Sequence, residues 1–501
     1  MEIDQKAKVG IGYGNNRIEC VRKAFAALGG IQQWVKPGHK VLLKPNIMAA
    51  QGGAQITHID TLKGLYLLCK EAGAKEVWVG ENSVCGMPPR IQMGIIGYDR
   101  ALEDIGMKVI FFDEEDWVYR FRGENYCLKD IHIPKSLVDA DVWITVPVAK
   151  THEACLTTLG LKNSHGILPD EDKARHHRGR PFGNSSLWEK FADIYAISKP
   201  HLCVTDMFHA MEGQGPAFGD IVEMKLVVAS ADSVACDATV EALMGFENLE
   251  CPLTKIAHKR GLGIGDMSQI QVLGENLLQH RRHFKRALWH PDSDRPYYGI
   301  RILAGDVCHG GCQMIVRYLI DLSHILFKKM ERELGPIYIM VGDNPPPPPE
   351  KAFILVFGDC AIYSSWHYEY RRRPKMIGPW WKPRKGYIDV QGCVPVQLEW
   401  IRSMAHLVEG YDPMASLGDA VSVVEADQVT FAEGISLEKN PRRWNFDREW
   451  ARKYAREIQE SKPPRYIYAA NESIKGQILR KTDPEVDRIL REAGVEPEQK
   501  G

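Results

Sequence analysis

Short hydrophobic runs alternate with amphipathic stretches along the first part of the chain. KVLLKPNIM, DVWITVPVA and HLCVTDMF are rich in β-branched residues and run into polar loops, which predicts buried strands. TLKGLYLLCKEAG and SLWEKFADIYAI repeat apolar residues at helical spacing and predict helices. Strands that alternate with helices favour a doubly wound α/β domain with a mostly parallel sheet, which we place at residues 1–285.

A polar, basic and turn-rich stretch within residues 275–298, with the sequence HRRHFKRALWHPDSDRP at its centre, predicts a domain boundary. A second α/β pattern follows in residues 296–430. GIRILAGDV, PIYIMVG, AFILVFGD and KGYIDVQG predict strands, and the run Pro345–Pro349 predicts a surface loop. Residues 431–501 are charged and poor in strand patterns, which predicts a helical extension.

The composition narrows the class of protein. The 501 residues are 44% hydrophobic and 26% charged, with a formal net charge of -1, so no global charge excess favours nucleic acid. No apolar run is long enough for a membrane span, and the N-terminus lacks the pattern of a signal peptide. We therefore expect a cytoplasmic protein whose 12 cysteines are thiols or metal ligands.

Four cysteines in the second half follow predicted strands. Cys308 and Cys312 come after RILAGDV, Cys360 after FILVFGD, and Cys393 after YIDVQG. The carboxyl ends of parallel strands share one edge of a sheet, and four thiolates are the ligands of a cubane [4Fe–4S] cluster. Nearby glycines would let the backbone approach a bulky cluster. A zinc site and four buried structural cysteines remain alternatives.

The spacing C-x-x-x-C, then Gly358-Asp359-Cys360-Ala361, then Gly392-Cys393-Val394-Pro395 resembles the small subunits of nickel–iron hydrogenases. It also resembles the 20-kilodalton subunit of respiratory complex I. The resemblance covers roughly residues 298–410 and implies a flavodoxin-like domain with a [4Fe–4S] cluster. The first motif departs from both families, which have C-x-x-C or adjacent cysteines, so Cys308 is the ligand most open to question.

Polar side chains also follow the predicted strands of the first domain. If the sheet is doubly wound, these side chains converge on one crevice, and their mixture of cations, histidines and carboxylates suits a small anionic substrate or cofactor. We expect catalytic roles for Lys150, His152, Asp206 and Asp237, and ligand binding by Lys44, Asn46, Lys162, Asn163 and Glu212. For any one of them a cap or an ion pair is the alternative. Gly10, Gly12 and Gly14 form only a weak dinucleotide fingerprint.

The same region resembles the prokaryotic family called domain of unknown function 362. The resemblance rests on five motifs over about residues 38–245: Lys44-Pro45-Asn46, Lys150-Thr151-His152, Lys162-Asn163 with Gly166, Glu212-Gly213-x-Gly215-Pro216 and Asp232-Ser233-Val234-Ala235-Cys236-Asp237. The family is often linked to iron–sulfur centres, so the resemblance implies a redox connection without giving a substrate.

These observations predict an iron–sulfur oxidoreductase in which the cluster passes electrons to or from the first domain. Its partners would be an electron donor or acceptor protein and the small anion, and the chain could be a homodimer or a complex subunit. The alternatives are a non-enzymatic electron-transfer or scaffold subunit and a metallocofactor maturation factor. We also expect Arg371–Arg373 and Trp380–Trp381, which lie between two cluster ligands, to line a recess beside the cluster.

Overall fold

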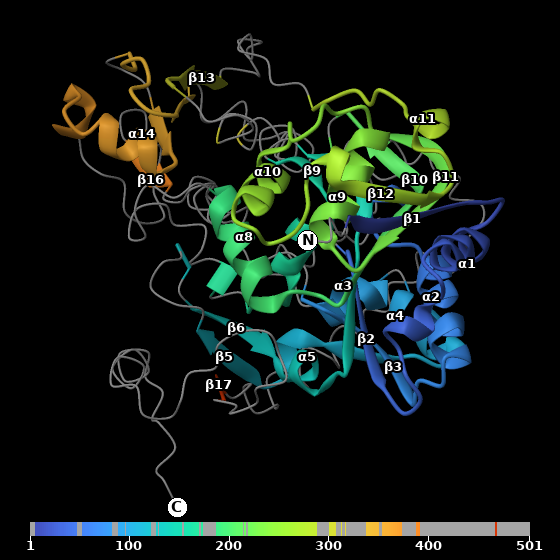
Figure 1. Cartoon of the computed structure of the whole chain (residues 1–501). Coiled ribbons are helices and arrows are strands. Elements are labelled where there is room, and N and C mark those ends of the chain that lie inside the picture. Colours follow the sequence, from blue (N-terminus) through green and yellow to red (C-terminus); the bar gives the residue numbers. More distant parts are fainter. Residues whose placement is uncertain are drawn as a thin grey trace, which may run out of the picture.

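The structure of the 501-residue chain is a computed structural model (Figure 1). It describes residues 6–47, 53–82, 89–95, 97–121, 127–128, 130–152, 155–169, 172–173, 187–213, 215–216, 219–287, 300–306, 312, 316, 337–349, 353–372, 387–390 and 466–467.

A ten-stranded, mostly parallel sheet forms the centre of the N-terminal part (Figure 1). Its order is β12 (Ile270–Gly274), β1 (Ala7–Tyr13), β11 (Asp220–Ser230), β10 (Leu202–Glu212), β7 (Val142–Val146), β2 (Lys40–Pro45), β3 (Glu76–Glu81) and β4 (Lys108–Phe111). Along this path β11 alone runs antiparallel to its neighbours. β8 (Val148–His152) pairs parallel with β10, and β9 (Leu156–Thr158) pairs antiparallel with β8. The prediction of an α/β fold with a mostly parallel sheet is thus confirmed.

Helices cover both faces of this sheet, because successive strand residues point to opposite sides. On β2, Leu43 packs in the core with α1 and α2, whereas Leu42 packs in the core with α8 and α10. The helices of the described N-terminal residues are α1 (Arg17–Ala27), α2 (Ile59–Glu71), α3 (Pro89–Ile95), α4 (Tyr98–Ile105), α5 (Lys135–Asp139), α6 (Gly160–Asn163), α8 (Leu187–Ser198), α9 (Ser233–Leu243), α10 (Pro252–Lys259) and α11 (Leu277–His280).

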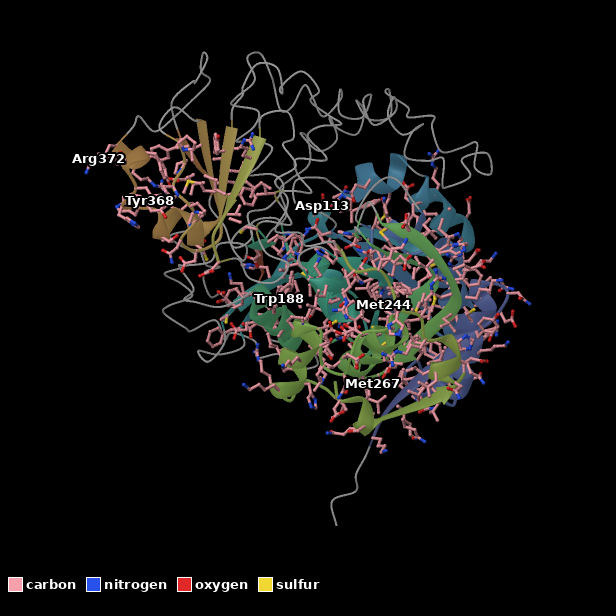
Figure 2. The ribbon with its side chains drawn as sticks, turned by 90° about the horizontal axis from the view of Figure 1, so that it is seen from above. Asp113, Trp188, Met244, Met267, Tyr368 and Arg372 are labelled. Carbon is pink, nitrogen blue, oxygen red and sulfur yellow. The ribbon has the colours of Figure 1, made fainter. Side chains whose placement is uncertain are left out.

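Two smaller sheets complete the described structure. A three-stranded sheet joins β17 (Tyr466–Ile467), β5 (Trp117–Phe121) and β6 (Asp130–Pro134). A four-stranded sheet, entirely parallel, has the order β13 (Ile300–Ala304), β14 (Ile337–Val341), β15 (Phe353–Phe357) and β16 (Tyr387–Val390). The short helix α14 (Asp359–Ser364) follows β15. The four-stranded sheet lies to one side of the large sheet in both views. Figure 2 labels Tyr368 and Arg372 beside the four-stranded sheet.

The chain still contacts the large sheet at Phe284 and Lys285, and the predicted domain boundary stays a prediction. Phe284 still packs in the core of the large sheet, and the Lys285 backbone N–H donates to Glu212 on β10. Nearly all of the predicted extension in 431–501 lies outside the described residues. No helix in the described ranges is both long and apolar enough to cross a membrane.

Helix α1 lies directly on β1 because two glycines leave room for it. A Cβ atom on Gly12 would stand 2.0 Å from the Cys20 carbonyl oxygen, and one on Gly10 would stand 2.3 Å from the Ala24 carbonyl oxygen. These glycines therefore serve a close approach of helix and strand. The sequence analysis judged them only as a dinucleotide fingerprint and did not predict that β1 itself contains them.

Helix α9 carries two buried carboxyl groups one turn apart. Asp237 accepts backbone hydrogen bonds from Gly160 and Leu161, both 2.8 Å long. Glu241 accepts from the hydroxyls of Thr157 at 3.2 Å and Thr254 at 2.7 Å. Burial raises the pKa of Asp237 to about 7 and, with the charge of Asp237 as a smaller cause, that of Glu241 to about 8. Both groups therefore favour their protonated forms in the folded protein.

Gly12→Ala should lower the free energy of unfolding by about 3 kcal/mol, at the upper end for overpacking, because the new methyl group meets backbone atoms that cannot turn aside. Gly14→Ala is the matched control, since its methyl would meet only the flexible Glu19 side chain. Urea unfolding of both variants tests this, and equal stabilities would contradict the close approach of α1 to β1.

The raised pKa values of Asp237 and Glu241 predict a loss of stability at alkaline pH. Their folded pKa values exceed the ordinary value near 4, so the stabilisation is complete below that value and is lost as pH rises through about 7 and about 8. Each proton lowers the free energy of unfolding by at most about 1.4 kcal/mol per pH unit in this window.

Glu241→Gln keeps an acceptor for the two threonines and removes one titrating group, so its unfolding free energy should fall less between pH 5 and pH 9, a range set by the folded pKa values. Urea unfolding across this range gives the slope, with Glu103→Gln on the exposed side of α4 as the control. An unchanged slope in Glu241→Gln would contradict the assignment.

Candidate functional site

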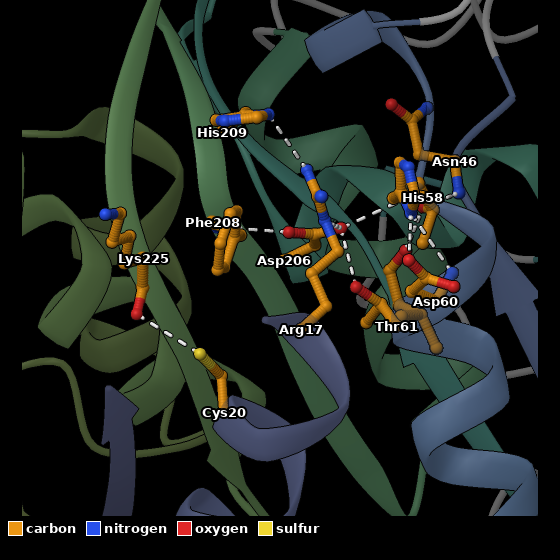
Figure 3. Close-up of polar contacts among 12 residues, drawn as sticks. Arg17, Cys20, Asn46, His58, Asp60, Thr61, Asp206, Phe208, His209 and Lys225 are labelled. Atoms are coloured by element: carbon orange, nitrogen blue, oxygen red, sulfur yellow. Dashed lines mark hydrogen bonds and ion pairs between the residues drawn. The ribbon is translucent and has the colours of Figure 1, made fainter. Parts of the chain in front are cut away.

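Parallel strands bring several polar residues to one edge of the large sheet. The strands β1, β2, β7 and β10 run in the same direction, so their carboxyl ends meet there. The helices α1 and α2 begin at this edge, after β1 and β2, and their first turns face β10 (Figure 3). The edge therefore combines strand-end side chains with the positive ends of two helices.

The carboxylate of Asp206 on β10 is the centre of this arrangement (Figure 3). It is 1% exposed. Its Oδ2 atom accepts from the Thr61 hydroxyl at 2.7 Å, from Arg17 Nε at 3.2 Å and from the His58 backbone N–H at 3.3 Å. Its Oδ1 atom accepts from the Phe208 backbone N–H at 3.1 Å. Asp206 thus joins β10 to the first turns of α1 and α2.

Two imidazoles lie beside Arg17 at this edge. The Nδ1 atom of His209 lies 3.3 Å from Arg17 Nη2, and the Nδ1 atom of His58 accepts from the Asp60 backbone N–H at 3.1 Å. Partial removal from water, and then the charge of Arg17, lower the pKa of both imidazoles. Because a guanidinium and a backbone N–H can only donate, both rings use Nδ1 as the acceptor and carry their proton on Nε2.

A second group of the predicted residues surrounds Lys150 on β8. The fully buried Lys150 ammonium donates to Asn46 Oδ1 at 2.5 Å and to the Gln55 carbonyl oxygen at 2.8 Å. His152 is buried two residues further along the strand. Burial, followed by the charges of Lys162 and Lys150, lowers the pKa of His152 well below its ordinary value. The predicted residues Asn46, Lys150, His152 and Lys162 thus lie close enough to influence one another.

Lys44 belongs to a separate buried ion pair. Its ammonium lies 2.7 Å from Glu81 Oε1, with both side chains almost completely buried, and it donates to Asn163 Oδ1 at 3.1 Å. Burial lowers the pKa of Lys44 and raises that of Glu81, and the pairing opposes both shifts. A Cβ atom on Gly166 would stand 2.5 Å from both charged atoms, so the chain closes tightly over the pair. Lys44 and Asn163 are therefore held in a structural contact.

One predicted site residue, Asp237, packs on the other face of the sheet. Asp237 is buried on α9, on the face of the sheet opposite α1 and α2, and it caps the first turn of α6. Glu212, at the end of β10, receives the Lys285 backbone N–H at 3.1 Å. The expectation of a single crevice is corrected here. The direction of a side chain on a helix is set by how that helix packs, and not by the strand that precedes it in the motif.

The structure describes two of the four candidate cluster ligands. Cys360 is exposed at the start of α14, directly after β15, and Cys312 is partly buried beyond β13. Cys308 and Cys393 lie outside the described residues. Among the residues that are described, no group of three or more His, Cys, Asp or Glu side chains is arranged to hold a metal ion.

Arg371 does not line a recess, contrary to the sequence expectation. Its side chain is 7% exposed and donates to Asp389 Oδ1 at 2.5 Å and to the Ile362 carbonyl oxygen at 3.0 Å. It therefore joins the segment after α14 to β16. Arg373 and Trp380–Trp381 lie outside the described residues.

Sequence reasoning missed four residues of the N-terminal part. The sequence predictions rest on residues that follow strands. Arg17 and His58 instead lie at the starts of helices, and Glu81 is the last residue of a strand. The signal available was local: Asn16 is a typical N-cap residue, and it places Arg17 in the first turn of α1. Thr61, in the first turn of α2, has no comparable signal.

Comparisons with known proteins agree with the N-terminal part of the sequence analysis. Residues 41–241 match the model of the family described as "Domain of unknown function (DUF362)". The "Thylakoid-associated protein sll1697" of Synechocystis sp. (strain ATCC 27184 / PCC 6803 / Kazusa) is 28% identical over 252 residues, which cover 49% of this chain and 75% of the relative. The family match does not extend into residues 296–430, so it gives no support to the hydrogenase and complex I resemblance.

Among solved structures, the lactate racemase apoprotein from Thermoanaerobacterium thermosaccharolyticum is similar at a TM-score of 0.34 and 10% identity. The similarity covers 68% of this chain and 71% of that chain, and at this level it carries no argument about fold or activity.

Proposed function

We propose that the protein is an iron–sulfur oxidoreductase. A [4Fe–4S] cluster in the C-terminal domain would exchange electrons with a small anionic substrate or cofactor at the carboxyl edge of the N-terminal sheet. The observation that carries this proposal is the fully parallel four-stranded sheet, with Cys312 beyond β13 and the exposed Cys360 directly after β15. Parallel strands place both cysteines at the same edge.

The local geometry fits a cluster at that edge. Gly358, two residues before Cys360, has a φ of 93° that favours glycine, and its backbone N–H donates to the Val390 carbonyl oxygen at 2.8 Å. The carboxyl ends of β15 and β16, which precede Cys360 and Cys393 in the sequence, are therefore joined by a hydrogen bond. Cys308, Cys312, Cys360 and Cys393 would hold the cluster, which supplies one-electron transfer when bound.

The N-terminal edge would contribute binding rather than redox chemistry. Lys150 and Asn46 form one hydrogen-bonded unit, and Arg17, His58 and His209 form another close to it. These groups are mostly cations and hydrogen-bond donors, which favour an anionic ligand. Lys44, Asn163 and Asp237 would act indirectly, by fixing the segments that form the edge.

A non-enzymatic electron-transfer subunit is the second candidate, and one observation favours it. Tyr363 on α14 and Trp366 just after it are 50% and 68% exposed, and both lie within a few residues of Cys360. Exposed aromatic side chains are enriched at protein interfaces. A partner protein bound there would lie next to the proposed cluster. Co-purification of a catalytic subunit that is lost in Trp366→Ala would favour this candidate.

For the location we propose the cytoplasm. The name of the cyanobacterial relative raises attachment to a membrane surface as the competing proposal for this chain. Separation of soluble and membrane fractions from native cells, followed by immunodetection, distinguishes the two.

Anaerobically purified protein should contain about four irons and four sulfides per chain. Cys360→Ser should lower both contents and change the EPR signal of the reduced protein, because serine replaces a thiolate ligand. Cys203→Ser is the control, since Cys203 is a buried cysteine of the N-terminal sheet. One zinc ion per chain in place of iron, or equal iron contents in the two variants, would refute the proposed cluster.

A further inference from the structure

Arg17 presents hydrogen-bond donors that the described protein does not use. Its Nε donates to Asp206, its Nη2 faces His209, and its Cζ lies 4.6 Å from the centre of the Phe208 ring. The side chain is 10% exposed. No hydrogen bond within the described residues reaches Nη1, so both of its N–H groups are available to a ligand although the side chain itself is nine-tenths buried.

The two imidazoles add donors without adding charge. Because His58 and His209 both accept at Nδ1, each presents an Nε2–H. The His209 Nε2 atom lies 3.8 Å from Glu223 Oε1, which is longer than a hydrogen bond, and the His58 side chain is 46% exposed. The half-exposed His58 N–H can therefore face a ligand beside Arg17, whereas the His209 ring contacts Arg17 through Nδ1 and directs its Nε2 toward Glu223.

Asn46 lies on the same side of the site. Its Oδ1 accepts from Lys150, which fixes the orientation of the amide and leaves Nδ2 as the outward group. Figure 3 shows the Asn46 amide above His58, on the side toward which the Arg17 guanidinium points. In this view the amide oxygen lies on the side of Arg17, so Asn46 borders the place that Arg17 of α1 and His58 at the start of α2 face.

The charges around this place favour a ligand with one negative charge. Arg17 is the cation, and its charge is shared with the buried Asp206. Asp60 lies beside His58, and Glu223 lies beyond His209. A phosphate dianion would face three carboxylates, of which Glu223 is paired with Lys225 at 3.6 Å, whereas a carboxylate matches the remaining donors of a planar guanidinium.

We propose that Arg17, His58, His209 and Asn46 form a binding site for the carboxylate group of a small organic acid. The inference deepens the proposed function by naming the chemical class of the ligand, and it rests on that function only in making the ligand a substrate. Binding itself requires no cluster, so the two ideas can fail separately.

Acetate should protect Arg17 from modification by phenylglyoxal, which reacts with accessible guanidinium groups. Peptide mass spectrometry of the full chain, treated at increasing acetate concentrations, follows each arginine separately. Arg22 on the same helix is the internal control, since it is exposed and paired with Glu71, and its modification should not depend on acetate. Equal modification of Arg17 with and without acetate would overturn the site.

Inorganic phosphate is the competing probe in the same experiment. We expect acetate to protect Arg17 at lower concentration than phosphate does at neutral pH. Stronger protection by phosphate would overturn the assignment to a carboxylate. Glu223→Gln should then narrow the difference between the two probes, because it removes one of the carboxylates that face the ligand.

Line broadening of carbon-13-labelled acetate measures binding in variants. Arg17→Lys keeps the charge but loses the planar fork, and should weaken acetate binding roughly tenfold. His58→Asn keeps an N-cap for α2 and removes the Nε2–H, so it should weaken binding by a smaller factor. Arg22→Lys should bind as the parent protein does, and equal broadening in all variants would overturn the proposal.

Cys360→Ser separates this inference from the proposed function. If it lacks the cluster and still binds acetate with the parent affinity, the carboxylate site stands independently of redox chemistry. If the parent protein carries the cluster but does not broaden the acetate signal, the carboxylate site is overturned and the cluster proposal stands.

Discussion

The buried carboxylate of Asp206 is where three elements of the N-terminal domain meet. A carboxylate removed from water is stable only when hydrogen bonds replace its hydration, and Asp206 receives four. Three of the donors come from the first turns of α1 and α2. Those turns must therefore lie close to β10, which places Arg17 and His58 at the edge of the sheet. The position of α1 also depends on Gly10 and Gly12, which allow the helix to lie directly on β1.

The buried ammonium of Lys44, further along the edge, also needs partners that replace its hydration. Lys44 is nearly inaccessible to water and is stabilised by Glu81, Asn163 and the Pro45 carbonyl oxygen. An ion pair this deeply buried contributes little net stability, because desolvation offsets the attraction between the charges. Loss of one partner would nevertheless leave an uncompensated charge. The pair therefore acts mainly by fixing how β2, β3 and the segment around Asn163 fit together.

The sequence predicted the strands well and the site only in part. The hydrophobic runs that became β2, β7 and β10 carry a strong local signal, since a buried parallel strand needs apolar residues on both faces. Strand ends therefore identified Lys150 and Asp206 correctly as edge residues. The assumption failed for Asp237, because its motif continues from a strand into α9 and the side chain faces the first turn of α6. Arg17 and His58 were missed because the local sequence at a helix N-terminus does not show which distant carboxylate it contacts in the fold.

The same difficulty explains Arg371. Its segment is dense in aromatic and basic residues, which in sequence is typical of a contact surface, yet the structure turns the guanidinium inward. It lies 4.9 Å from the Tyr370 ring centre and 5.0 Å from that of Tyr387, and it pairs with Asp389. A cation can serve either a ligand or the protein itself, and the presence of a buried carboxylate decides between the two.

Charge balance gives Arg17 a different role from Arg371, although both pair with an aspartate. The two terminal nitrogens of Arg371 contact one carboxylate, one backbone carbonyl oxygen and one hydroxyl oxygen of its own domain, whereas its buried Nε has no partner among the described residues. Arg17 shares its carboxylate with Thr61 and with the backbone of His58, so Asp206 needs only one of its N–H groups. The imidazole beside Arg17 is kept neutral, because partial burial and the guanidinium charge both lower the pKa of His209. A neutral imidazole does not repel the Arg17 cation. It also does not compete with an anionic ligand for the charge of Arg17. The Arg371–Asp389 pair therefore stabilises a core. The Arg17–Asp206 pair leaves donors of Arg17 directed toward the edge of the sheet.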